Sequence, residues 1–188
     1  MSNESQTRVS KHTIKNAGFS LVELLVTVAI LGVAMGFAAL SYSLVSRSNV
    51  NKTVGYISDA LSMCRQRSMA SAGQWEVVIE NGSVEVVKTS KNDGTAVSEV
   101  ISSQALPSHV DVYAAESKGV YTNKIDSTQP LRISFNMLNG DIKDIMVNSG
   151  SIKTAGSNYC YISCRYKDKK EQWVKIYYAT GKHETVTK

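Results

Sequence analysis

Residues 15–36, KNAGFSLVELLVTVAILGVAMG, decide the architecture of this chain of 188 residues. After Glu23 no charged residue follows until Arg47, so residues 24–46 are uncharged and mostly apolar. A helix needs about 20 such residues to cross a bilayer. The stretch therefore predicts a membrane-spanning helix that carries a single carboxylate near its start.

The 18 residues before this helix form a basic leader, in which Arg8, Lys11 and Lys15 outnumber Glu4. Basic residues prefer the cytoplasmic side of a membrane, so we expect the chain after residue 46 to lie outside the cytoplasm. A secretory signal has an apolar core of about 7–15 residues and is removed. The apolar run here is longer, which favours a helix that the mature protein keeps.

Glu23 has two interpretations. A carboxylate is favourable at a helix N-terminus, where it meets the positive end of the helix dipole. Alternatively it needs a cation, because an acidic residue at the centre of a membrane helix costs about 2.5–3.5 kcal/mol and somewhat less near the edge. Cleavage after Gly18 would supply one, the new α-amino group of Phe19, either in the same chain or in the next copy of a stack of parallel helices.

The stretch Gly18-Phe19-Ser20-Leu21-Val22-Glu23, between a basic leader and an apolar helix, resembles the signature of type IV prepilins and pseudopilins. The resemblance implies cleavage between Gly18 and Phe19 by a prepilin peptidase, N-methylation of Phe19 and assembly into a helical filament. It also implies an assembly role for Glu23. Many major pilins carry a proline midway along this helix, which residues 24–73 lack.

A GxxxG pair, Gly32 and Gly36, stands in the apolar run instead of that proline. Small residues at this spacing let membrane helices approach closely, although they are also common in such helices without that role.

Apolar and small residues continue at helical spacing beyond the uncharged run. They are Val50, Val54, Ile57, Leu61, Cys64, Ser68 and Ala72. Gly73 is a plausible helix stop. We therefore predict one helix from Phe19 to Ala72, about 80 Å long at 1.5 Å per residue, whose second half packs against a head domain.

The period changes to two after residue 74, and Asn81-Gly82 joins two alternating segments as a hairpin turn would. Seven or eight short strands are expected, with irregular structure at 114–130, 149–157 and in the tail 180–188. The predicted fold class is α+β, a long N-terminal helix on an antiparallel β-sheet head of pilin-like type. The expected domain boundaries are a cleaved leader 1–18, a transmembrane or filament-core helix 19–46, its amphipathic half 47–73 and a β-rich extracytoplasmic head 74–188.

Three short stretches are similar to GspH/FimT-type minor pilins and pseudopilins: LSMCRQRSMASAG at the end of the predicted helix, and ISFNMLNGDI and VKIYYATGKHETV in the head. Some members of that group bind DNA through basic tail residues with the pattern Gly-Arg-x-Arg. The matching residues here are Gly181-Lys182-His183-Glu184, where an acid replaces the second basic residue.

Positive charge collects at the C-terminal end. Residues 47–159 carry eleven basic and eleven acidic residues, whereas 160–188 carry seven basic and three acidic ones. The segment also holds aromatic residues, on which single strands can stack. The candidate DNA contacts are Lys167, Lys169, Lys170 and Lys182. The alternative is that lysines keep an exposed hairpin tip soluble and that the aromatics form strand.

The three cysteines are Cys64, Cys160 and Cys164. Four residues along a strand span about 13 Å, too far for a disulfide between the last two, which needs Cα atoms within about 7 Å. We interpret them as core thiols, with a CxxxC metal half-site as the alternative.

No catalytic motif is present, and the histidines His12, His109 and His183 are scattered. We expect no enzyme, metal or cofactor. The predicted function is a minor pilin or pseudopilin subunit of a type IV pilus-like or type II secretion filament. Its partners would be a prepilin peptidase/methyltransferase, other pilin subunits, the membrane, and an assembly platform and motor. Two alternatives are a DNA receptor in uptake (competence) and a signal-anchored surface protein that never polymerises.

Overall fold

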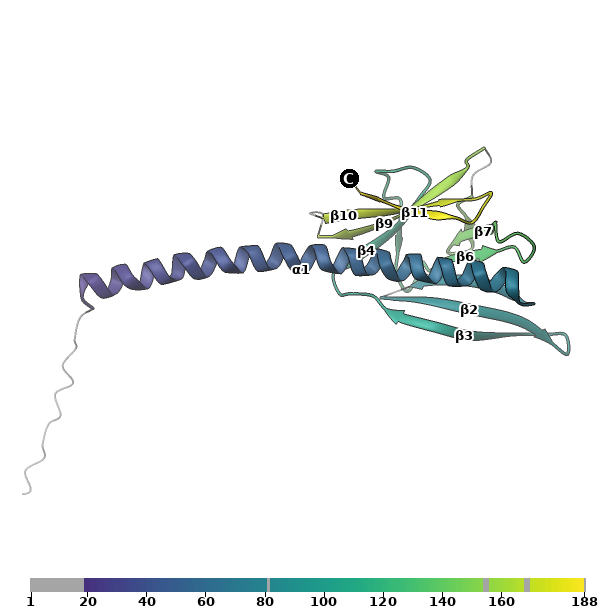
Figure 1. Ribbon diagram of the computed structural model, residues 1–188, viewed down its shortest axis with the longest axis horizontal. Coiled ribbons are helices and arrows are strands. Elements are labelled where there is room, and N and C mark those ends of the chain that lie inside the picture. The colour runs from purple at the N-terminus through teal and green to yellow at the C-terminus, as the bar shows by residue number, and fades with distance from the viewer. Residues whose placement is uncertain (1–18, 81, 154–155, 168–169, 188) are drawn as a thin grey trace, which may run out of the picture. The chain divides into compact units, whose positions relative to one another are not determined.

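The computed structural model describes residues 19–80, 82–153, 156–167 and 170–187 of the chain. One helix, α1 (Leu21–Ala70), is followed by strands in two antiparallel sheets (Figure 1). The strands are β1 (Gln74–Glu80), β2 (Ser83–Asn92), β3 (Thr95–Ala105), β4 (Val110–Ala115), β5 (Asn123–Ile125), β6 (Leu131–Phe135), β7 (Ile142–Val147), β8 (Gly150–Ser151), β9 (Tyr159–Tyr166), β10 (Lys170–Tyr177) and β11 (His183–Thr187). The α+β, pilin-like fold class is confirmed.

The chain divides into two compact units, Met1–Ser41 and Tyr42–Lys188. The described part of the first unit is the apolar start of α1. The second unit, which we call the head, contains the rest of α1 and both sheets. The amphipathic part of the helix therefore belongs to the same compact body as the strands.

Turn chemistry sets the longest hairpin of the head. Asp93 and Gly94 both have positive φ, 49° and 82°, and they connect β2 to β3. Two central residues with positive φ match the twist of the flanking strands, which is why Asp-Gly is favoured there. The strands therefore run further into the sequence SKNDGT than its polar composition predicts.

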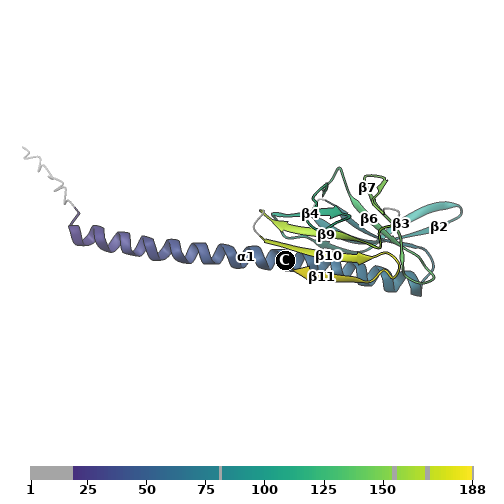
Figure 2. The same ribbon diagram turned by 90° about the horizontal axis from the view of Figure 1, so that it is seen from above.

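The sheets have the orders β3-β2-β1-β6-β7-β8 and β11-β10-β9-β4-β5. Strands β10 and β11 run alongside the second half of α1, as Figure 2 shows. Register is continuous where β10 meets β9, from Lys170 opposite Tyr166 to Tyr177 opposite Tyr159. A bulge between Val86 and Val87 interrupts the pairing of β2 with β3.

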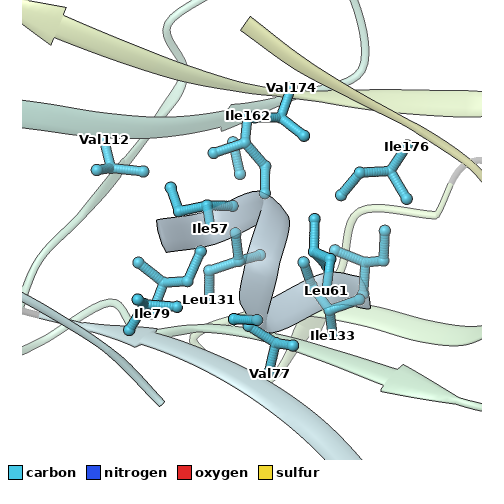
Figure 3. Packing of buried hydrophobic residues seen from close by; sticks show 14 of the residues in the cluster. Ile57, Leu61, Val77, Ile79, Val112, Leu131, Ile133, Ile162, Val174 and Ile176 are labelled. Atoms are coloured by element: carbon cyan, nitrogen blue, oxygen red, sulfur yellow. The ribbon is translucent and has the colours of Figure 1, made fainter. Parts of the chain in front are cut away.

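The core of the head lies where the second half of α1 meets both sheets. Ile57 and Leu61 lie between residues of the five-stranded sheet, such as Ile162, and residues of the six-stranded sheet, such as Ile133 (Figure 3). These side chains are at most 1% exposed. The predicted helical stripe is buried from Val50 to Ser68, but Ala72 is exposed because the helix ends at Ala70.

Three regions expected to be irregular contain strands. The tail forms β11, the loop 114–130 contains β5, and the loop 149–157 contains β8. The expectation of an irregular tail is wrong because β10 offers β11 a full antiparallel register, from Gln172 opposite Thr187 to Ile176 opposite His183. The expected seven or eight strands are also too few.

Candidate functional site

The expected processing site lies at the start of the described chain. Gly18 lies outside the described residues, and Phe19 is 79% exposed immediately before α1. Glu23 stands in the first turn of the helix, four residues after Phe19, and its side chain is exposed. Within residues 19–46 Glu23 is the only charged side chain. A free α-amino group on Phe19 would therefore be the nearest cation along the chain.

Ser20 caps the helix, a role that the sequence analysis missed. The Glu23 backbone N–H donates to Ser20 Oγ at 3.2 Å, and the Leu24 N–H donates to the Ser20 carbonyl at 3.2 Å. Serine at the N-cap with glutamate three residues later is the capping-box pattern, in which the glutamate can return a bond to the N-cap N–H. The signal Ser-x-x-Glu before an apolar run was available in the sequence.

The first part of α1 presents apolar side chains all round. Nearly all its large apolar residues are more than half exposed, among them Leu24 at 61%, Val33 at 61% and Phe37 at 67%. One window, Leu21–Ala38, is long and apolar enough to cross a membrane by length and composition. A Cβ placed on Gly32 or Gly36 meets nothing within 4 Å, so the GxxxG pair is an open notch on this surface. Such a surface is unstable in water and needs lipid or other apolar helices around it.

Within the described part of the chain, the candidate DNA-contacting lysines Lys167, Lys170 and Lys182 do not form one patch. Lys167 and Lys170 are exposed beside the turn between β9 and β10, and Lys169 lies outside the described residues. Lys182 lies past the far end of β10, where its carbonyl accepts a bond from the Tyr177 N–H at 2.9 Å. The two ends of β10, Lys170 and Tyr177, are seven residue steps apart, which is about 23 Å along a strand.

Glu184, the acid in the tail pattern, is held by the neighbouring strand. Its carboxylate accepts a hydrogen bond from the Tyr177 hydroxyl at 2.7 Å and lies 3.8 Å from Lys175 Nζ. Lys175 in turn stands over the Tyr159 ring, 4.3 Å from its centroid. The Glu184 carboxylate therefore offsets the positive charge of Lys175 on β10.

A small basic pocket forms where the tail meets α1. The cavity, about 280 Å³, is lined by Arg65, Lys182 and His183 together with Ser62, Gln66 and Gly181. Arg65 Nε donates to the Thr180 carbonyl at 2.9 Å, which fixes the guanidinium beside the turn. Burial lowers the pKa of His183, and the Arg65 charge lowers it further, while Asp59 opposes both effects. Arg65 was not predicted here, because only tertiary folding brings the helix to the tail.

Of the six aromatic residues between positions 159 and 178, three are buried and three are at least partly exposed. Trp173, Tyr166 and Tyr178 are at most 5% exposed, so they cannot stack on a strand of nucleic acid. Tyr159 is 36% exposed, and its ring meets those of Tyr161 and Tyr177 edge-on. The aromatic residues that remain accessible for stacking are therefore Tyr159, Tyr161 and Tyr177.

The three cysteines are free and buried. Burial raises the pKa of each of the thiols Cys64, Cys160 and Cys164 to about 12. Their assignment as core thiols is confirmed, since all three belong to the buried cluster of the head. Among the described residues, no three His, Cys, Asp or Glu side chains gather in a metal-binding arrangement.

Comparison with known proteins identifies one family match. The prokaryotic N-terminal methylation motif matches residues 14–39, which include the expected cleavage site, Glu23 and most of the apolar window. No curated protein and no solved structure matches the chain. Over these residues the chain therefore carries a prepilin-type N-terminal methylation motif.

Proposed function

We propose that this chain is a minor pilin or pseudopilin, a subunit of a type IV pilus-like or type II secretion filament. A prepilin peptidase cuts between Gly18 and Phe19, a methyltransferase modifies Phe19, and the apolar start of α1 then enters the filament core. The observation that carries the proposal is the methylation motif at residues 14–39, on a helix whose apolar residues are exposed.

In this proposal Glu23 pairs with the α-amino group of Phe19 from a neighbouring subunit. A carboxylate among apolar helices is costly unless a cation meets it. The new amine is the cation that processing supplies, and the rest of residues 19–46 carry no other charge. The pairing also sets the axial register of one helix against the next.

The capping box provides the control that separates the two roles of Glu23. Glu23→Gln keeps the shape of the side chain and its ability to accept a hydrogen bond but removes the charge. Ser20→Ala removes the cap and leaves the charge. Filaments sheared from native cells that express each variant are compared by the amount of this subunit that they contain, with Glu99→Ala on the exposed strand β3 as a matched control.

We expect Glu23→Gln to lower incorporation by about tenfold or more, because an unpaired buried amine costs several kcal/mol. Ser20→Ala, which removes about 1 kcal/mol of capping, should keep most of the incorporation. Equal losses for Ser20→Ala and Glu23→Gln would show that Glu23 acts as a cap. Normal incorporation of Glu23→Gln would refute the pairing.

A second candidate function is that of a DNA receptor in uptake, and the basic pocket of Arg65, Lys182 and His183 favours it. Phosphate groups need clustered cations, and binding to them weakens as salt rises. A gel shift with the full chain in detergent tests the candidate. The receptor function is supported if Arg65→Gln and Lys182→Gln each weaken DNA binding while Lys88→Gln leaves it unchanged. No shift at low salt removes the candidate.

A further inference from the structure

The charges along α1 change sign on the far side of the apolar run. Between Glu23 and Asp59 the only charged residues are Arg47 and Lys52, and both are positive. A hydrocarbon core of about 30 Å takes about 20 helical residues. With Glu23 at one boundary, the other boundary falls near Leu44, and Arg47 follows about 5 Å later at 1.5 Å per residue.

Lys170 of the head lines the same cavity as Arg47, and Lys167 lies across the β9–β10 turn from Lys170. A cavity of about 220 Å³ is lined by Arg47, Val50 and Asn51 of α1, by Lys170, Glu171 and Gln172 at the start of β10, and by Thr187 of β11. Lys167 stands next to Tyr166, the residue opposite Lys170 in the β9–β10 register. Arg47, Lys167 and Lys170 are all exposed, and we call them the membrane-proximal basic cluster.

Among the residues that the structure describes, Glu171 is the acidic one that lines this cavity, and it has partners of its own. Glu171 accepts hydrogen bonds from the Ser163 hydroxyl at 2.8 Å and from the Tyr121 hydroxyl at 3.0 Å. It also lies 3.8 Å from Arg165 Nε. Glu171 therefore offsets part of the positive charge at this cavity and shares its own charge with Arg165.

We propose that the membrane-proximal basic cluster binds the phosphate groups of anionic phospholipids in the leaflet next to the head while the precursor is still in the bilayer. The inference rests on the proposed function, because it requires that α1 be inserted. Chain connectivity alone places Arg47 at headgroup level, since the headgroup layer extends about 5–7 Å beyond the hydrocarbon. Each basic residue at an anionic membrane surface raises the binding affinity about fivefold.

Nucleic acid is the competing ligand for the same lysines. The observations favour lipid, because residues at headgroup depth leave no room for a DNA duplex while the chain is inserted. Lys182, at the other end of β10, is not part of the cluster and serves as an internal reference.

Amine footprinting of the full chain in lipid nanodiscs tests the proposal. The chain is placed in nanodiscs of phosphatidylcholine alone or with about one third phosphatidylglycerol, acylated briefly, and analysed by mass spectrometry at each lysine. We expect Lys167 and Lys170 to react at least threefold more slowly in the anionic nanodiscs. Lys182 and Lys88 should react equally in both. High salt should remove the difference, since it screens the attraction.

A variant pair tests whether the guanidinium takes part. Arg47→Gln should weaken the protection of Lys170, whereas Lys182→Gln should leave it unchanged. Equal reactivity of Lys167 and Lys170 in the two lipids, with the apolar segment protected from protease, would overturn the lipid proposal and leave the pilin function intact. Failure of the apolar segment to insert would overturn both. Protection by an added oligonucleotide but not by anionic lipid would assign the cluster to DNA.

Discussion

At the scale of single residues, glycines decide where the chain makes its closest approaches. Gly181 has φ +61°, and a Cβ there would lie 2.0 Å from the Gly140 carbonyl oxygen. Gly140 itself has φ +66° and lies against Met69 of α1. The two turns therefore meet each other by backbone contact, and Gly140 lies against the Met69 and Arg65 side chains of α1, which fixes one wall of the basic pocket.

Gly181→Ala should destabilise the head by about 3 kcal/mol or more, because a left-handed conformation costs about 1–2 kcal/mol and the backbone contact must also open. The measurement is urea unfolding of the full chain in detergent, followed by the fluorescence of the buried Trp75 and Trp173. Gly94→Ala is the matched control, since φ there is +82° and nothing lies within 4 Å. An equal loss in both variants would contradict the contact.

The thiols give a second prediction at this scale. Their pKa is raised to about 12 by burial, so the folded head keeps them protonated where the unfolded chain, near pKa 9.0, ionises. The contribution of the three protonated thiols to the free energy of unfolding is fully present below pH 9. It falls as the pH rises from about 9 towards 12.

Iodoacetamide at pH 8 should therefore leave all three cysteines unmodified in the folded protein and label them once urea unfolds it. Rapid labelling of any of them under native conditions would contradict its burial. Between pH 9 and 11 the urea midpoint should fall, and Cys160→Val should reduce that slope.

At the scale of elements, local sequence signals were enough to predict the helix and most of the strands. The helical stripe from Val50, the hairpin turn at Gly82 and the strand that holds Cys160 and Cys164 were predicted correctly. The strands β5, β8 and β11 were missed because they are short or polar, and only pairing with a neighbouring strand defines them. Ser20 could have been found from its spacing to Glu23, whereas the meeting of Arg65 with Lys182 depends on tertiary packing.

The packing of α1 against the two sheets of the head should depend on Ile57, whose side chain lies between them and is 0% exposed. Ile57→Ala should cost about 2–5 kcal/mol, the range for a large side chain truncated in a core. Val97→Ala, on the exposed strand β3, should change stability by less than about 0.5 kcal/mol. Urea unfolding in detergent compares the two, and a small effect of Ile57→Ala would place the helix outside the core.

At the scale of the whole molecule, the chain combines an apolar helix that cannot remain in water with a head that buries its own core. The apolar segment carries one charge, Glu23, and the motif around it predicts a proteolytic event that creates the opposite charge. The head adds the membrane-proximal basic cluster, which we propose binds anionic lipid. Cleavage is thus the step that would convert a membrane-anchored precursor into a subunit able to assemble.

The mass of the mature N-terminal peptide tests this account most directly. The chain is isolated from membranes and sheared filaments of its native cells, digested, and its first peptide is sequenced by mass spectrometry. The account predicts a peptide that begins at N-methylated Phe19, and Gly18→Leu should leave the leader uncut. A mature protein that still begins at Met1, or one cut elsewhere, would contradict it.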